Sequence, residues 1–367
     1  MDTVQEEENQ IQVRFVTQQK EFAVTDSAIL VPTKLRRYGL SEIINHLLGF
    51  DNQFLRTSLE EYLQTKELST ENILIIEYVE SMLPPTSLST FQHDDWISAV
   101  KGYNKSLFLT GSYDNHVRIF NTSGECLQTL LGHIAPIKSV EWVSLKDGQY
   151  TPLYDCKGHK ESVECISVNS SCTEFVSVSL DSSILLWTTT QPETSHVGPI
   201  SSVMFDKNDS NKMYSGGWDH SIRVWDVETR TNIDTKICDK TVLGIACSDN
   251  LIASGHSDKL VRIWDPRAED TAMVKLTLSS HKNWVSCVSW SPKSQFMLAS
   301  GSYDGTVKIW DIRSRTPLYT IQNSNSQEKN SLMKKLFCID WDLDMILSGG
   351  EDNQLHLYGT KTLDIQS

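Results

Sequence analysis

The stretch Leu-Ala-Ser-Gly-Ser-Tyr-Asp-Gly-Thr-Val-Lys-Ile-Trp-Asp at residues 298–311 decides the fold of this 367-residue chain. Small and apolar residues precede a tight turn with Asp304 and Gly305, and Val307 and Ile309 then alternate with polar residues. This is the pattern of a β-hairpin. Because one hairpin cannot bury its own faces, the stretch predicts a larger structure built from several such units.

The same pattern occurs six times between residues 111 and 358. Each copy has an aspartate in the turn and an aromatic residue six positions later. The turn aspartates are Asp114, Asp181, Asp219, Asp258, Asp304 and Asp352. The aromatic residues are Phe120, Trp187, Trp225, Trp264, Trp310 and Tyr358. The register resembles the WD repeat, whose units of roughly 40 to 45 residues form the four-stranded blades of a β-propeller.

Three dipeptides, Gly132-His133, Gly158-His159 and Ser280-His281, resemble the Gly-His element that precedes the inner strand of a WD repeat. In that family the histidine, a strand Ser or Thr, the turn aspartate and the tryptophan form one hydrogen-bonded set inside a blade. The resemblance therefore implies that these residues are structural, with polar groups satisfied within the fold. It does not favour an acid–base pair for catalysis.

The spacing of the turn aspartates predicts one irregular blade. Successive aspartates are 38 to 48 residues apart from Asp181 to Asp352, but 67 residues separate Asp114 from Asp181. That interval is too long for one blade and too short for two. It contains an expected inner strand at 137–143 and an expected outer strand at 150–156, but no Asp-turn hairpin. We predict a mainly β fold with a propeller of the seven-blade type whose second blade is incomplete.

Composition excludes several classes of function. The net charge of −14 argues against a protein that binds nucleic acid by neutralising phosphates, so no direct sequence-specific binding is expected. The eight cysteines include no Cys-x-x-Cys pair, which predicts reduced intracellular thiols and no intrinsic metal site. The acidic start and the lack of an 18-residue apolar run predict neither secretion nor membrane insertion. No phosphate loop, H-E-x-x-H or G-x-S-x-G motif is present, so we expect no enzyme and no cofactor.

The first 85 residues have a different pattern. Residues 10–18 and 21–32 predict a β-hairpin, and a strand is expected at 72–79. Leu40, Ile43, Ile44, Leu47 and Leu48 form the apolar stripe of an amphipathic helix that ends at Gly49. A short helix is expected from a capping box near residue 57 to about Lys66.

This order of elements is that of a ubiquitin-like β-grasp domain. Pro84-Pro85 ends it, because consecutive prolines leave no donors for a strand ladder. We predict a β-grasp domain at 1–85, a linker at 86–95 and the propeller at 96–360. The last blade has no obvious fourth strand, and residues 86–92 offer one that would close the ring.

Several segments resemble a known combination of domains. They are residues 13–15 (VRF), 37–49 (RYGLSEIINHLLG), 55–59 (LRTSL), 76–78 (IEY), 83–85 (LPP) and 94–98 (DDWIS). Together they are similar to the Notchless-like amino-terminal domain followed by WD repeats, as in the WD-repeat subunit of the PeBoW complex. Three features depart from the family pattern: a short connection between Gly49 and Phe54, the incomplete second blade, and only Thr188 to Gly198 where a basic insertion is usual. They leave open a skipped exon, an incomplete gene model or a shortened lineage.

The resemblance implies a non-catalytic scaffold in ribosome biogenesis. Its partners would be pescadillo, the block-of-proliferation protein and pre-60S particles in the nucleus, nucleolus and nucleoplasm, where it would support maturation of the 28S and 5.8S rRNAs and assembly of the 60S subunit. It also implies that Glu71 binds in trans to the metal site of the AAA ATPase midasin. The alternative is a substrate adaptor of a ubiquitin ligase, since WD propellers often recognise degrons.

Overall fold

In the computed structural model, the structure describes residues 10–17, 24, 27–33, 35, 40, 43, 73–77, 82–143, 155–187, 193–194, 196–267, 274–322 and 334–360. The chain forms two compact units, one ending at Leu83 and one spanning Pro84–Thr360. The boundary predicted from the sequence lies near residue 85. No helix in the described part of the chain is long and apolar enough to cross a membrane.

The first unit contains a three-stranded sheet in the order β2–β1–β3. The central strand β1 (Gln10–Val16) pairs antiparallel with β2 (Ile29–Pro32) and parallel with β3 (Leu74–Glu77). Alternate residues of β1 enter the core and pack with Val31 and with Leu40, which is helical. The rest of the predicted helix, the short helix and Glu71 lie outside the described residues, so the β-grasp fold stays a prediction.

The described residues of the second unit form a β-propeller with six four-stranded antiparallel sheets. Each sheet is one blade, named here by its inner strand. The inner strands are β5 (Ile97–Tyr103), β9 (Val163–Val168), β13 (Ile200–Phe205), β17 (Val242–Cys247), β21 (Val285–Trp290) and β25 (Leu336–Asp342). The second strands are β6 (Leu107–Ser112), β10 (Phe175–Ser179), β14 (Lys212–Gly217), β18 (Ile252–His256), β22 (Met297–Ser302) and β26 (Met345–Gly350).

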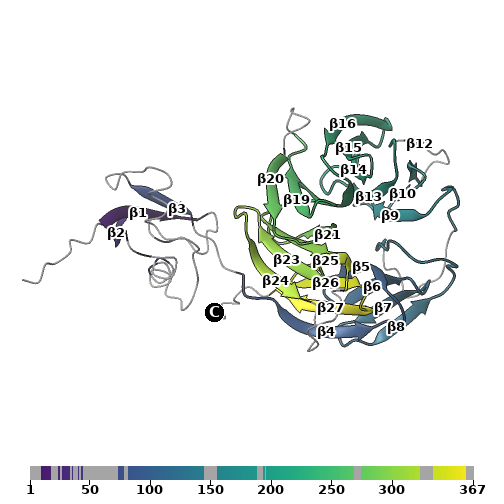
Figure 1. The fold of residues 1–367 in the computed structure, drawn as a ribbon, viewed down its shortest axis with the longest axis horizontal. Helices are drawn as coiled ribbons and strands as arrows, with labels where there is room; N and C mark the ends of the chain where they lie inside the picture. Colours follow the sequence, from purple (N-terminus) through teal and green to yellow (C-terminus); the bar gives the residue numbers. More distant parts are fainter. Residues whose placement is uncertain are drawn as a thin grey trace, which may run out of the picture. The chain divides into compact units, whose positions relative to one another are not determined.

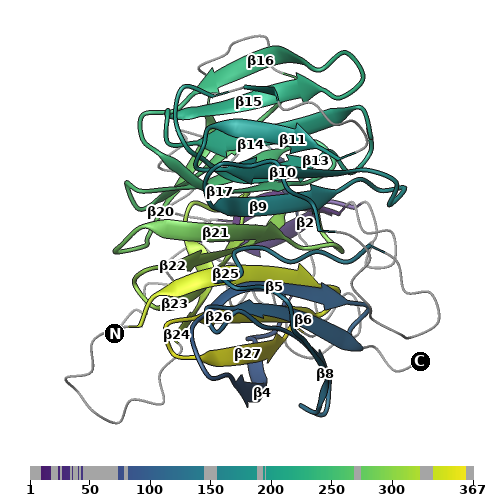
Figure 2. The ribbon, with the colours of Figure 1, turned by 90° about the vertical axis from the view of Figure 1, so that its right-hand side faces the viewer.

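The third strands and the outer strands complete each blade. The third strands are β7 (Val117–Asn121), β11 (Ser183–Leu186), β15 (Ser221–Asp226), β19 (Leu260–Trp264), β23 (Thr306–Asp311) and β27 (Gln354–Gly359). The outer strands are β8 (Cys126–Leu130), β12 (Glu193–Thr194), β16 (Thr231–Ile237), β20 (Val274–Ser279), β24 (Pro317–Gln322) and β4 (Thr86–Gln92). The blades follow one another in chain order around a ring (Figure 1), and their strands are stacked in the side view (Figure 2).

The last blade takes its outer strand from the amino-terminal end of the propeller. Strand β4 pairs antiparallel with β27, and Gln92 lies opposite Gln354. This pairing covers the outer edge of β27, which would otherwise expose unpaired backbone groups. The segment for which the sequence suggested a closing role is therefore a strand of the β25 blade.

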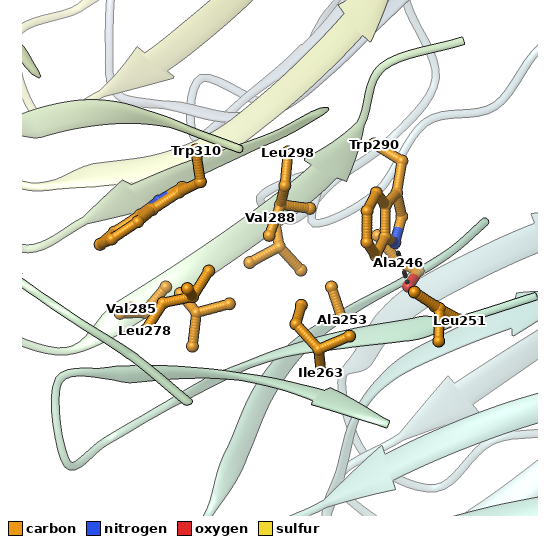
Figure 3. Close-up of a cluster of buried hydrophobic side chains, with 11 residues drawn as sticks. Ala246, Leu251, Ala253, Ile263, Leu278, Val285, Val288, Trp290, Leu298 and Trp310 are labelled. Atoms are coloured by element: carbon orange, nitrogen blue, oxygen red, sulfur yellow. Dashed lines mark hydrogen bonds between the residues drawn. The ribbon is translucent and has the colours of Figure 1, made fainter. Parts of the chain in front are cut away.

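The core lies between neighbouring blades. Figure 3 shows one such layer, in which Ala253 and Ile263 of the β17 blade face Val288 and Leu298 of the β21 blade. Trp290 Nε1 donates a hydrogen bond of 3.1 Å across this layer to the carbonyl oxygen of Ala246. Small and β-branched residues alternate with polar ones in these strands, so each blade presents one apolar face to each neighbour.

The described part of the incomplete second blade is one segment that packs between β5 and β9. The sequence predicted an inner strand at 137–143, but these residues form no strand, because no described segment pairs with them in a ladder. Ile137 and Val140 are nevertheless buried in a cluster with Ala99, Leu109 and Ile119. Of the outer strand expected at 150–156, only Asp155 and Cys156 belong to the described residues, and both are exposed.

On the side that faces β5, the segment makes the same hydrogen bonds as the inner strands of other blades. Ser98 Oγ donates to the carbonyl oxygen of Ile137, just as Ser201 Oγ of the β13 blade donates to the carbonyl oxygen of Val242 at the start of β17. Trp142 Nε1 donates to the carbonyl oxygen of Lys101 at 3.2 Å. This repeats the cross-blade bond of Trp290.

The β9 side of the segment is also matched. The backbone N–H of Ile166 donates to Ser139 Oγ at 3.2 Å, and that of Ile245 donates to the equivalent Ser202 Oγ at 3.1 Å. Residues 137–142 therefore fill the inner position of a seventh blade, for which the described residues form no sheet.

Candidate functional site

The turn aspartate of the β21 blade is part of a buried hydrogen-bonded set. Asp304 Oδ2 lies 3.0 Å from His281 Nδ1, and the carboxylate also accepts bonds from the backbone N–H of Lys282 and of Thr306. His281 Nε2 lies 2.7 Å from Ser300 Oγ, which accepts a bond of 2.8 Å from Trp310 Nε1. The set joins the loop before the inner strand to the second and third strands of the blade.

Two other blades contain the same arrangement. One set is His159, Asp181, Ser177 and Trp187, and the other is His196, Asp219, Ser215 and Trp225. His196 was not selected from the sequence, although Ser195-His196 has the same Ser-His form as Ser280-His281. Its distance of 23 residues before Asp219 equals that of His281 before Asp304, and this spacing was the available signal.

The other three blades bind the turn aspartate differently. The nearest partners are Arg118 for Asp114, Arg262 for Asp258 and His356 for Asp352, each 2.6 Å away. In the β17 blade a second-strand histidine, His256, lies 2.7 Å from Ser254 Oγ, which accepts a bond from Trp264 Nε1.

His133 does not take the place that the sequence suggested. It is exposed, and no hydrogen bond among the described residues joins it to an aspartate, serine or tryptophan. The physical reason is the missing hairpin of the second blade, which would have supplied the turn aspartate and the strand hydroxyl. The Gly-His dipeptide is therefore present without the aspartate and the hydroxyl group that the histidine would bond.

These sets fix charge states inside the blades. Although burial opposes ionisation of Asp304, hydrogen bonds from His281 and Thr306 hold its pKa well below its usual range. Burial lowers the pKa of His281, so the ring is neutral near pH 7. Within the described part of the chain, no group of three or more His, Cys, Asp or Glu side chains could hold a metal ion. The arrangement serves to join strands, and it leaves no exposed acid–base pair.

Two other buried histidines predict a pH dependence of stability. Burial, with a smaller contribution from a neighbouring arginine, lowers the pKa of His93 and of His256 to about 4. Since an unfolded histidine titrates near 6.5, the unfolded chain binds more protons between pH 6.5 and 4. Stability is therefore complete above pH 6.5 and decreases as the pH falls toward 4.

We expect the free energy of unfolding to be about 1 to 2 kcal/mol lower at pH 6 than at pH 8 from these two residues together. Urea denaturation of the full chain at the two pH values measures this difference. The double substitution His93→Gln with His256→Gln should reduce it. An undiminished pH dependence in that variant would contradict the assignment.

One face of the propeller carries a contiguous group of aromatic rings. The residue before the turn aspartate is Tyr113 in the β5 blade and Tyr303 in the β21 blade, and its backbone N–H donates at 2.9 Å to Trp96 and to Trp284 respectively. Both positions therefore lie at the end of the blade where the chain enters its inner strand. Phe337, the second residue of β25, lies between the two tyrosines at ring distances of 6.2 and 5.8 Å.

The two tryptophans extend this group outward. Trp96 lies 5.6 Å from the ring of Tyr113, and Trp284 stacks on Tyr303 at 5.8 Å. Their exposed fractions are 41% and 47%, which is unusual for residues that normally bury large apolar area. We call Trp96, Tyr113, Trp284, Tyr303 and Phe337 the aromatic face. It is the candidate docking site, since exposed aromatic residues are typical centres of protein interfaces.

The aromatic face was not predicted from the sequence. Its local signal was the aromatic residue before the turn aspartate in three cassettes, at Tyr113, Trp218 and Tyr303. Trp218 is 50% exposed on the β13 blade but joins none of the ring contacts of the described residues. The sequence identifies the three aromatic positions. Only the arrangement of the blades in the ring shows which of these side chains are close enough to belong to one group.

Comparison with known families assigns both parts of the chain. The NLE (NUC135) domain matches residues 11–63. The WD domain, G-beta repeat, matches residues 85–121, 150–188, 190–226, 236–265 and 273–311. None of these segments covers residues 122–149, which include the reduced second blade.

Relatives match over nearly the full length. The chain is 36% identical to the ribosome biogenesis protein WDR12 homolog of Nematostella vectensis, over 95% of this chain and 99% of that protein. It is 34% identical to the ribosome biogenesis protein ytm1 of Schizosaccharomyces pombe, over 97% and 98%. The first alignment runs over 422 positions, more than a 367-residue chain can fill, so this chain lacks residues that the relative has. The chain belongs to the WDR12/Ytm1 family of ribosome biogenesis proteins.

Proposed function

We propose that this chain is a non-catalytic scaffold in assembly of the 60S ribosomal subunit. It would act in the PeBoW complex with pescadillo and the block-of-proliferation protein, in the nucleolus and nucleoplasm, and support maturation of the 28S and 5.8S rRNAs. The observation that carries the proposal is the full-length similarity to ribosome biogenesis proteins. The propeller supports it, because a closed ring of packed blades holds exposed side chains such as those of the aromatic face in fixed positions.

Affinity purification of the tagged chain from nuclear extract tests this proposal. Recovery of pre-60S particles together with pescadillo is the expected result. Recovery of cullin subunits instead would favour the ubiquitin-ligase adaptor. Fluorescence of the tagged chain confined to the cytoplasm would contradict the proposed location.

The proposal includes a contact of the amino-terminal domain with midasin through Glu71. This residue lies outside the described residues, and its role rests on the resemblance to Notchless-like domains. The chemistry is reasonable, because Mg²⁺ held by one or two carboxylates and waters has an exchangeable position that a carboxylate from another protein can fill at about 2.1 Å.

Glu71→Ala is expected to abolish Mg²⁺-dependent binding to midasin while the propeller partners are retained. Glu71→Asp should also fail, because its carboxylate is one methylene shorter. Pull-down of midasin with and without EDTA measures the effect, and the nearby acid replacement Glu67→Ala is the matched control. Wild-type binding that survives EDTA, or normal binding by Glu71→Ala, would contradict this role.

A further inference from the structure

Two lysines lie over tyrosine rings of the aromatic face. Lys138 Nζ lies 4.4 Å from the ring centre of Tyr113 and donates a hydrogen bond of 2.7 Å to its hydroxyl oxygen. Lys335 Nζ lies 5.7 Å from the ring centre of Tyr303. A lysine is thus placed over each of the two tyrosines, in a protein with a net charge of −14.

Only part of this charge is neutralised within the protein. Lys335 is paired with Glu351 at 2.9 Å. In the described part of the chain, Lys138 forms no ion pair with a carboxylate, and neither does Lys282, which is exposed two residues before Trp284. The face therefore combines exposed rings, which favour an apolar side chain, with ammonium groups that favour a carboxylate.

The arrangement of charge favours a peptide over RNA. The carboxylate of Asp94, two residues before Trp96, is 84% exposed and pairs with Arg118 at 2.7 Å, so one carboxylate already borders the aromatic face. A nucleic-acid strand carries a phosphate at every nucleotide and cannot avoid such a group, and its affinity depends on neutralising several phosphates. A peptide can place its carboxylates near Lys138 and Lys282 and its apolar side chains elsewhere.

We propose that the aromatic face binds an acidic polypeptide segment with aromatic or aliphatic anchors. The anchor packs against Trp96, Phe337 and Trp284, and the flanking carboxylates pair with Lys138 and Lys282. This inference rests on the proposed scaffold role, for which it names the chemistry of one partner. It concerns a different surface from the amino-terminal domain and does not involve Glu71.

Fluorescence anisotropy with the purified full-length chain tests the proposal. The probe is a labelled peptide with the sequence Glu-Asp-Leu-Trp repeated three times. The comparison probes are the same peptide with Lys at the acidic positions, the same peptide with Ser at the apolar positions, and a twelve-nucleotide oligo-uridylate. We expect the acidic and apolar peptide to bind at least about ten times more tightly than each of the others, with affinity that decreases as salt increases.

Two variants locate the site. Trp284→Ala and Lys138→Glu should each weaken binding of the acidic peptide about tenfold or more, because each removes one of the two contributions. Trp218→Ala removes a tryptophan of similar exposure from the β13 blade and should change the affinity less than about twofold. Thermal melts of the three variants verify that each is folded, and Lys138→Arg, which keeps the charge, should retain binding if Lys138→Glu unfolds the chain.

Tighter binding of oligo-uridylate than of the acidic peptide would overturn the proposal in favour of an RNA surface. Equal losses for Trp284→Ala and Trp218→Ala would also overturn it, because binding would then not depend on the aromatic face. The assay contains no ribosomal particle, so its outcome is independent of the affinity purification. Peptide binding without pre-60S recovery would contradict the proposed function alone.

Discussion

Replacing Asp304 with alanine is expected to lower the free energy of unfolding of the propeller by about 3 kcal/mol. The carboxylate accepts hydrogen bonds from the side chains of His281 and Thr306 and from the backbone N–H groups of Lys282 and Thr306. Asp304 and His281 are each only 7% exposed, so water cannot replace the lost acceptor. Donors left buried without an acceptor each cost about 1 to 3 kcal/mol.

Urea denaturation followed by tryptophan fluorescence measures this loss. Asp239→Ala is the control, because the side chain of Asp239 is 87% exposed and its contact with Arg262 is weak at 3.4 Å. That variant should stay within about 0.5 kcal/mol of the wild type. If Asp304→Ala is no less stable than Asp239→Ala, the set around His281 does not hold the β21 blade together.

Replacing Ile137 with alanine is expected to cost about 3 kcal/mol, although this residue lies in no regular strand. Ile137 is 7% exposed and packs in one cluster with Ala99 and Ile119, in the position of an inner strand. Truncation removes apolar contacts and leaves a cavity beside Gly111, whose backbone the side chain of Ile137 covers. The blades on either side would then lose the segment that joins them.

Ile134→Ala is the matched control for this experiment. Ile134 lies three residues earlier in the same segment and is 97% exposed, so its truncation should change stability by less than about 0.5 kcal/mol. Denaturation of both variants under identical conditions gives the comparison. Similar small losses for the two would show that residues 137–142 do not replace an inner strand.

The propeller was predictable from the sequence because its signal is local and repeated. The hairpin around Asp304 and Gly305 contains both the turn residues and the alternating apolar residues of the next strand. Five related segments repeat the same spacing. The closing strand β4 was also suggested by counting strands in the last blade. Such counting depends on chain order alone, so it needs no knowledge of side-chain contacts.

The second blade and the docking site were less accessible to sequence reasoning. Residues 137–143 have the sequence pattern of a strand. A strand also requires a hydrogen-bonded neighbour, and the described residues supply none. Gly132-His133 matches the dipeptide that precedes an inner strand, but His133 has no turn aspartate to bond with among the described residues. The aromatic face joins Trp96 to Trp284 across three blades, and no local pattern determines which blades adjoin.

The pairing of β4 with β27 means that β4 is synthesised long before its partner strand. Gln92 and Gln354, which bond side chain to side chain at this seam, are 262 residues apart in the chain. At roughly 5 to 20 residues per second, translation of that interval takes about 13 to 50 s. During this time β4 has no partner strand, and its exposed backbone can pair with any other extended chain. The nascent protein therefore exposes its earliest propeller strand until almost the last residue of the ring has been made.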